Sequence, residues 1–170
     1  GLIGGVAGAA FPTHKTAMAM SGARELKDGE NSFVVTFTSP DVGGVKLVKT
    51  FTLRRGSYTI DVSHDVTNTG AAPVTPQLYV QLVRDGNKTD SETPFYSTFT
   101  GPAVYTGAQK YQKVEFADLD AKKASFEKNA TDGYVAMVQH YFASAWLPQD
   151  GAAREYYVEP VPGEKNLYRM

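Results

Sequence analysis

The chain alternates apolar and polar residues over a long stretch that begins near residue 32, and this period of two restricts what it can fold into. Phe33, Val35 and Phe37 share one face of an expected strand, and the run 45–53 repeats the pattern after a break at 39–44. Because successive side chains of a strand point to opposite faces, the alternation indicates half-buried antiparallel strands. The two runs predict a hairpin with a loop longer than the tight two-residue type.

A third run, residues 58–67, has the clearest alternation in the chain and ends at a turn over 68–73. The side chains expected to face inward from it are Tyr58, Ile60, Val62, His64 and Val66. A further strand is expected at about 77–83. Both of its faces are only partly polar, which is typical of a strand covered on two sides.

The middle of the chain is less regular. Residues 84–94 read as a polar loop, and 95–105 form an aromatic-rich extended stretch that Gly101-Pro102 is expected to break. Residues 110–116 suit a short edge strand, where lysines discourage unwanted pairing. For 118–129, a helical turn and a surface loop are both open.

Residues 134–148 are ambiguous by pattern. Their apolar side chains recur at the i, i+3, i+4, i+7 spacing of an amphipathic helix. The same residues also fit two buried strands with a kink near Gln139-His140, which their aromatic and β-branched content favours. The residue pattern alone does not decide between the two.

Composition narrows the function classes. The length of 170 residues suits a single domain, and hydrophobic residues at 42% with charged residues at 21% are typical of a globular protein. Seventeen Lys and Arg against 18 Asp and Glu give a net charge of -1, so no nucleic-acid partner is expected. The absence of cysteine excludes thiolate catalysis, and three histidines in no ligand spacing predict no metal and no cofactor.

The candidates for chemistry are few. His64 falls on an apolar strand face and is expected to be a core histidine, with an acid–base pair with His140 as the weaker alternative. Asp61 and Asp65 lie four residues apart on one strand, about 13 Å, which is too far for a glycosidase carboxylate pair.

Aromatic residues in loop-like segments are the more promising feature. They either fill the core or border a concave face that stacks on a sugar or takes an extended peptide. The residues predicted to border this cleft are Phe95, Tyr96, Phe99, Tyr105 and Tyr111.

The first 31 residues are expected to be a leader and a partial edge of a domain that spans 32–170. The glycine-rich opening, residues 1–10, lacks the basic start of a signal peptide. It also lacks the strand and the following motif of a phosphate-binding loop.

Two stretches resemble a known family. Residues 49–58, continuing through 66–70, and residues 133–148 are similar in order and spacing to the large periplasmic domain of the YidC family of bacterial membrane protein insertases. The resemblance implies an all-β fold, a β-supersandwich like that of galactose mutarotase, with at most short helical segments. It favours two strands over a helix for 134–148.

The resemblance also implies a function without catalysis. The domain would be an incomplete periplasmic part of an insertase at the bacterial inner membrane, acting as a binding and scaffolding module. Its implied partners are SecDF, other Sec translocon components and nascent membrane proteins, reached by strand addition or by aromatic-groove docking. The alternative is a carbohydrate-binding or epimerase-like domain that uses the supersandwich cleft, although a shared fold is weak support for an activity.

Overall fold

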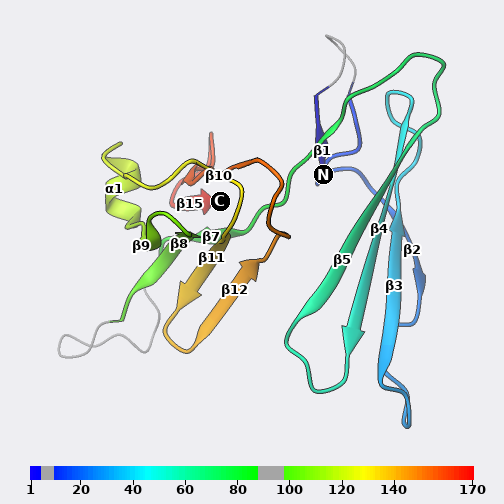
Figure 1. Ribbon diagram of the computed structural model, residues 1–170, viewed down its shortest axis with the longest axis horizontal. Coiled ribbons are helices and arrows are strands. Elements are labelled where there is room, and N and C mark those ends of the chain that lie inside the picture. Colours follow the sequence, from blue (N-terminus) through cyan, green and yellow to red (C-terminus); the bar gives the residue numbers. More distant parts are fainter. Residues whose placement is uncertain (5–9, 88–97) are drawn as a thin grey trace. The chain divides into compact units, whose positions relative to one another are not determined.

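The computed structural model describes residues 1–4, 10–87 and 98–170, and the chain divides into two compact units, residues 1–79 and 80–170. Antiparallel strands make up both units, and the helix α1 has only five residues (Figure 1). The expectation of an all-β chain with short helical segments at most is therefore confirmed for the described residues.

The first unit is built around a four-stranded antiparallel sheet in the order β2-β3-β4-β5. The expected hairpin with a long loop is present, because β3 and β4 pair from Ser32↔Arg54 to Thr38↔Val48. The turn between β4 and β5 contains Gly56, whose φ of 71° favours glycine. The strands are β2 (Ala19–Gly22), β3 (Ser32–Thr38), β4 (Val45–Arg54) and β5 (Ile60–Asn68).

The buried core of the first unit lies at one end of this sheet. Val45 and Leu47, at the start of β4, are fully buried and pack with Leu2 and Phe11. Leu2 belongs to β1 (Leu2–Ile3), which pairs with β6 (Gln77–Leu78). Residues from the first 31 therefore supply part of this core, and β2 forms one edge of the sheet.

The apolar face of β5 is more exposed than its alternation predicts. Ile60 and Val66 are exposed, Tyr58 is fully exposed just before the strand begins, and Val62 and His64 are half-buried. The prediction of an inward face is wrong for the three exposed residues. Tyr58 and Ile60 lie at the end of β5 far from this core, which gathers at the start of β4. Val66 is exposed although it pairs with the buried Leu47, because β5 is an edge strand of the sheet.

The second unit contains a four-stranded antiparallel sheet in the order β12-β11-β8-β9. The segment 134–148 forms the hairpin β11–β12, so the strand interpretation is confirmed. The expected burial is wrong for β12, whose first four residues are exposed because it is an edge strand. Pairing on both sides explains why strands form here, because β11 is hydrogen-bonded to β8 as well as to β12. The strands are β8 (Thr100–Thr106), β9 (Lys110–Lys113), β11 (Tyr134–Gln139) and β12 (Phe142–Trp146).

The expected break at Gly101-Pro102 is wrong, since β8 continues through both residues. The Pro102 carbonyl faces the β9 side, where it accepts a hydrogen bond from the Val114 N–H at 2.9 Å. The Pro102 nitrogen, which has no hydrogen to donate, faces the same side as its carbonyl. At that level β9 has already ended, since its last residue is Lys113. No hydrogen bond to β11 is therefore lost, and a proline is tolerated inside the sheet.

One face of this second sheet carries the core of the unit. Val104, Val135 and Met137 pack there against α1 (Phe116–Asp120) and the C-terminal residues. The expected strand at 77–83 is divided, since Gln77–Leu78 and Val83–Asp85 belong to different units. The remaining short strands are β7 (Val83–Asp85), β10 (Asn129–Ala130), β13 (Arg154–Glu155), β14 (Glu159–Pro160) and β15 (Leu167–Arg169).

Candidate binding pocket

Three tyrosines lie side by side on the sheet face opposite the core of the second unit. Tyr105 of β8 is paired directly with Tyr111 of β9 and with Tyr134 of β11. The rings of Tyr105 and Tyr134 are stacked, with centroids 5.2 Å apart and planes 9° from parallel. Burial, and then the neighbouring Tyr134, raise the pKa of Tyr111. The row is an aromatic platform whose outer member is 44% exposed.

A pocket of about 360 Å³ opens beside the stacked pair. Its size falls in the range that small ligands and single side chains occupy. The aromatic and apolar lining comes from Tyr105, Tyr134, Leu147 and Pro148. The rest of the lining is Gly107, Gly133 and the two carboxylates, Asp132 and Asp150.

Two glycines allow the backbone to close around this pocket. Gly133 has a φ of +88°, and a Cβ there would lie 1.9 Å from the Tyr105 carbonyl oxygen. A Cβ on Gly107 would lie 2.3 Å from Asp132 Oδ2. Glycine is required at 133 both for its conformation and for the close approach to β8.

Asp132 is held in place at both its side chain and its backbone. The Gly107 N–H donates to Asp132 Oδ2 at 2.9 Å, and the Tyr156 hydroxyl donates to the Asp132 carbonyl at 2.7 Å. Burial is the largest cause of the raised pKa of Tyr156, so its hydroxyl stays protonated as a donor. The carboxylate of Asp132 is therefore positioned before any ligand arrives.

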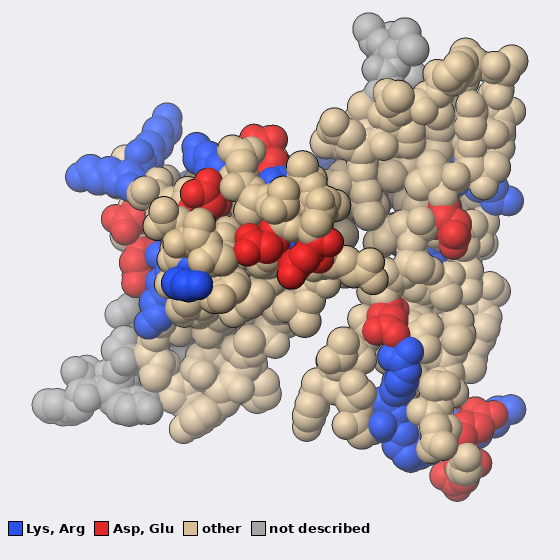
Figure 2. All heavy atoms as spheres, viewed as in Figure 1, with Lys and Arg blue, Asp and Glu red and all other residues tan. Residues whose placement is uncertain are grey.

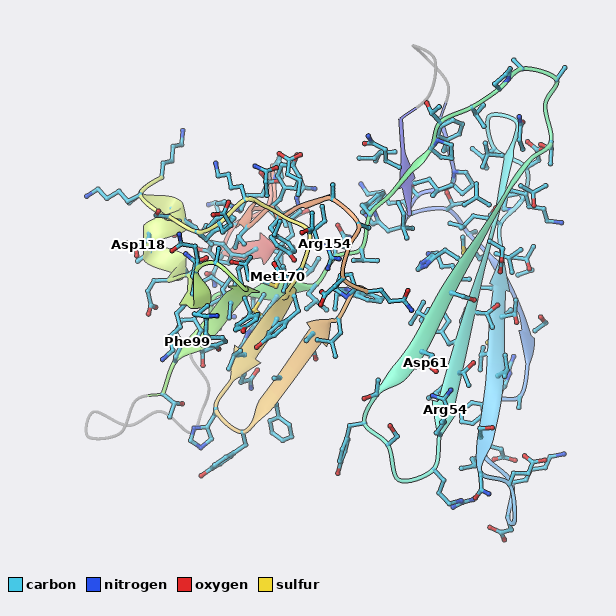
Figure 3. The ribbon with its side chains drawn as sticks, viewed as in Figure 1. Arg54, Asp61, Phe99, Asp118, Arg154 and Met170 are labelled. Carbon is cyan, nitrogen blue, oxygen red and sulfur yellow. The ribbon has the colours of Figure 1, made fainter. Side chains whose placement is uncertain are left out.

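Arg154 organises the loop that forms the far wall of the pocket. Its Nη1 donates to the carbonyls of Gly133 at 3.2 Å and Pro148 at 3.4 Å. The same guanidinium also donates to the carbonyls of Thr131, Gln149 and Ala152. Because one planar group joins 131–133 to 148–152, the two walls are fixed relative to each other. Figure 3 shows Arg154 at this loop, away from Phe99 and Asp118.

The sequence-predicted cleft residues do not all lie together. Tyr105 lines the pocket and Tyr111 is its neighbour in the sheet. Phe99 precedes the other end of β8, about 20 Å along the strand from Tyr105, where Lys113 Nζ lies 5.1 Å from its ring centroid. Phe95 and Tyr96 lie outside the described residues.

Sequence reasoning missed Tyr134 and the two aspartates as site residues. Tyr134 lies in the stretch 133–148 that carries the family resemblance, and Asp132-Gly133 is a turn signal before it. No local pattern indicates that this turn meets the β8–β9 hairpin, because the contact joins residues 25 positions apart.

The two histidines of the acid–base alternative lie in separate units. His64 is on β5, directly opposite Lys49 of β4, and its pKa is lowered by burial first and also by the charge of Lys49. His140 lies in the turn after β11, where its Nδ1 is 2.8 Å from Thr98 Oγ1. Asp61 forms an ion pair with Arg54 at 2.5 Å on an exposed surface.

The charges on the described surface are mixed. On the face in view, Figure 2 shows Lys and Arg interspersed with Asp and Glu. Within residues 1–4, 10–87 and 98–170, no group of three or more His, Asp or Glu residues could hold a metal ion. In the same residues, no helix has the length and apolar character to cross a membrane.

Comparisons with known proteins give a consistent result. The whole chain, residues 1–170, matches the family described as the YidC periplasmic domain. It is 51% identical over 169 residues to proteins named membrane protein insertase YidC from Burkholderia cenocepacia and Burkholderia ambifaria. It is 49% identical over 168 residues to the protein of that name from Burkholderia thailandensis.

In each case 98% of this chain is covered, and the chain spans about 30% of the length of these relatives. The match therefore concerns one part of a longer protein. The matched range extends over both compact units. The chain belongs to the YidC periplasmic domain family.

Proposed function

We propose that the chain is a non-catalytic binding and scaffolding module of a membrane protein insertase, at the periplasmic face of the bacterial inner membrane. Its family membership and the name of its relatives, membrane protein insertase YidC, support this role. Insertion itself is then the work of the whole protein, of which this chain corresponds to about 30% of the length. The chain contributes surfaces rather than reacting groups.

The observation that carries this proposal is the pair of apolar edge strands. In the described part of the chain, β5 and β12 each end a four-stranded sheet. Exposed apolar side chains accompany them, namely Tyr58 and Ile60 beside β5, and Tyr141 and Phe142 beside β12. An edge strand presents unpaired backbone donors and acceptors, so an extended segment of another protein can add to it.

The partners that suit these edges are extended protein segments. The proposed sources of such segments are SecDF, other Sec translocon components and nascent membrane proteins. Main-chain hydrogen bonds along the edge would supply affinity, and the alternate apolar side chains would supply specificity. No nucleic-acid partner is proposed, because the net charge of -1 offers no attraction to phosphates.

Photocrosslinking in the full-length protein in its native membrane tests the proposal. A photoreactive amino acid placed at Tyr58 or at Tyr141 is expected to crosslink to a Sec component or to a nascent membrane protein. The control is the same residue at Lys122, which is exposed at the end of α1. Crosslinks of equal yield from Lys122, or none from either edge, would overturn the proposal.

The alternative is a sugar-binding or epimerase-like domain. An epimerase would need His64 and His140 close together and beside a carboxylate. These residues belong to different units, and each has its own surroundings, Lys49 for His64 and Thr98 for His140. Turnover of an aldose by the full-length protein, lost in His64→Gln, would favour this alternative.

A further inference from the structure

We propose that the pocket beside Tyr105 and Tyr134 receives an arginine side chain from an extended segment of a protein partner. The pocket is lined by Tyr105, Gly107, Asp132, Gly133, Tyr134, Leu147, Pro148 and Asp150. This proposal rests on the proposed function in one respect, that the partner is a protein. What it adds is the chemical group of the partner that the pocket recognises.

The charge of the lining selects a cation. Two of the eight lining residues, Asp132 and Asp150, are carboxylates, and none is Lys or Arg. Arg154 is not among the lining residues, and its guanidinium donates to backbone carbonyls, including those of Gly133 and Pro148 in the lining. A cation that enters the pocket meets carboxylate oxygens without first displacing a lysine or arginine from the lining.

The aromatic lining selects a guanidinium among cations. A guanidinium is planar and stacks on a tyrosine face while its N–H groups reach a carboxylate. The stacked pair of Tyr105 and Tyr134 and the carboxylate of Asp132 border the same pocket. Ring and carboxylate are thus available to one planar group, an arrangement that a compact ammonium uses less well.

The site is also organised in advance. Asp132 is fixed by the Gly107 N–H and by Tyr156, and the 148–152 loop is fixed by Arg154. Little side-chain or loop ordering then remains to oppose binding, which favours recognition of a single side chain. The volume of about 360 Å³ admits a guanidinium with its stem.

Binding of short peptides to the 170-residue chain, followed by amide NMR spectra, tests the proposal. The probe is acetyl-Gly-Arg-Gly-amide, and the matched control is the same peptide with citrulline, which keeps the shape and removes the charge. We expect the arginine peptide to shift the amide signals of Gly107 and Gly133. Its affinity should be about fivefold or more above that of the citrulline peptide, as expected for one favourable charge pair.

Substitutions identify the site. Asp150 is exposed, so Asp150→Asn should leave the fold intact and weaken arginine-peptide binding about fivefold. Asp118→Asn removes the same charge from α1 and should leave the binding unchanged. Added salt should weaken the binding of the arginine peptide and leave that of the citrulline peptide unchanged.

Three results would overturn the inference. These are equal binding of both peptides, an equal effect of Asp150→Asn and Asp118→Asn, and shifts at Gly107 and Gly133 with methyl glucoside but not with the arginine peptide. The last would assign the pocket to a sugar. Crosslinks from Tyr58 or Tyr141 without binding of the arginine peptide would contradict this inference but would still support the proposed function.

Discussion

At the scale of single residues, two positions have a role that depends on what lies opposite them. Gly133 is forced by the Tyr105 carbonyl as well as by its own positive φ. The pKa of His64 is lowered by its place on β5, where burial and the facing Lys49 disfavour the charged form of its ring. Each can be tested by a substitution with a matched control.

Replacing Gly133 by alanine is expected to destabilise the second unit by several kcal/mol. The new Cβ must avoid the Tyr105 carbonyl while the residue keeps a φ of +88°. Gly163→Ala is the control, because Gly163 has a similar φ of +83° and nothing within 4 Å of a Cβ. Urea unfolding should show a loss of about 1–2 kcal/mol for the control. Equal losses for the two variants would contradict the close approach.

Replacing Lys49 by glutamine is expected to raise the pKa of His64. The lowered pKa means that the folded state resists protonation, so this residue contributes stability above its ordinary pKa of about 6.5. That contribution is lost as the pH falls through the lowered value. The variant should therefore lose less stability on acidification than the parent.

An NMR titration of the His64 ring measures this effect directly. Lys46→Gln is the control, since Lys46 pairs with Thr67 on the opposite face of β4. An unchanged His64 pKa in Lys49→Gln, or an equal rise in Lys46→Gln, would contradict the assignment.

At the scale of elements, the β11–β12 hairpin and the loop after it determine the pocket. Residues 134–148 form strands despite the helical spacing of their apolar side chains, because β11 is paired on both sides, to β8 and to β12. His140 takes the turn with a φ of 41°. The following loop has no regular structure over 147–153, and Arg154 joins its carbonyls to those of 131 and 133.

Replacing Arg154 by lysine is expected to loosen this loop while keeping the charge. A lysine has three donors on a flexible stem and cannot reach five carbonyls at once. The Gly151 amide, which donates to the Thr131 carbonyl at 2.7 Å, should exchange its hydrogen about tenfold faster. Arg55→Lys, in the first unit, should leave that exchange unchanged. Unaltered exchange at Gly151 in Arg154→Lys would contradict the bracing role.

At the scale of the whole molecule, the chain has two compact units with separate buried cores. The first core contains Val45 and Leu47, and the second contains Val104 and Leu119. The two clusters share no residue. A substitution in one core is therefore expected to destabilise the unit that contains it and not the other unit.

Leu47→Ala and Leu119→Ala make a matched pair of core truncations. Each is expected to cost about 2–5 kcal/mol, because a buried leucine leaves a cavity. Hydrogen exchange should accelerate at the amides of β3–β5 for the first variant and at those of β8 and β11 for the second. A single loss of protection spread equally over both units would show one cooperative body instead.

Much of the fold follows from local pattern. The alternation in 32–38, 45–53 and 58–67 predicts three antiparallel strands, and these form β3, β4 and β5, the last beginning at Ile60 rather than at Tyr58. Local pattern fails where burial is decided from outside the segment. Ile60, at the start of β5, is exposed although the strand alternates well. Strand β8 continues through Pro102 because β11 needs no N–H donor from that residue.

The sequence by itself determined the period of two, the turns and the absence of thiol chemistry, because each depends on a residue and its near neighbours. Tertiary structure alone decided that 134–148 forms strands, since the spacing of its apolar residues fits both a helix and a hairpin, and the pairing of β11 with β8 and β12 separates the two. It also decided the pocket, which joins Tyr105 to Tyr134 across 29 positions of the chain. Such a contact depends on how distant segments pair, and no short-range periodicity encodes that.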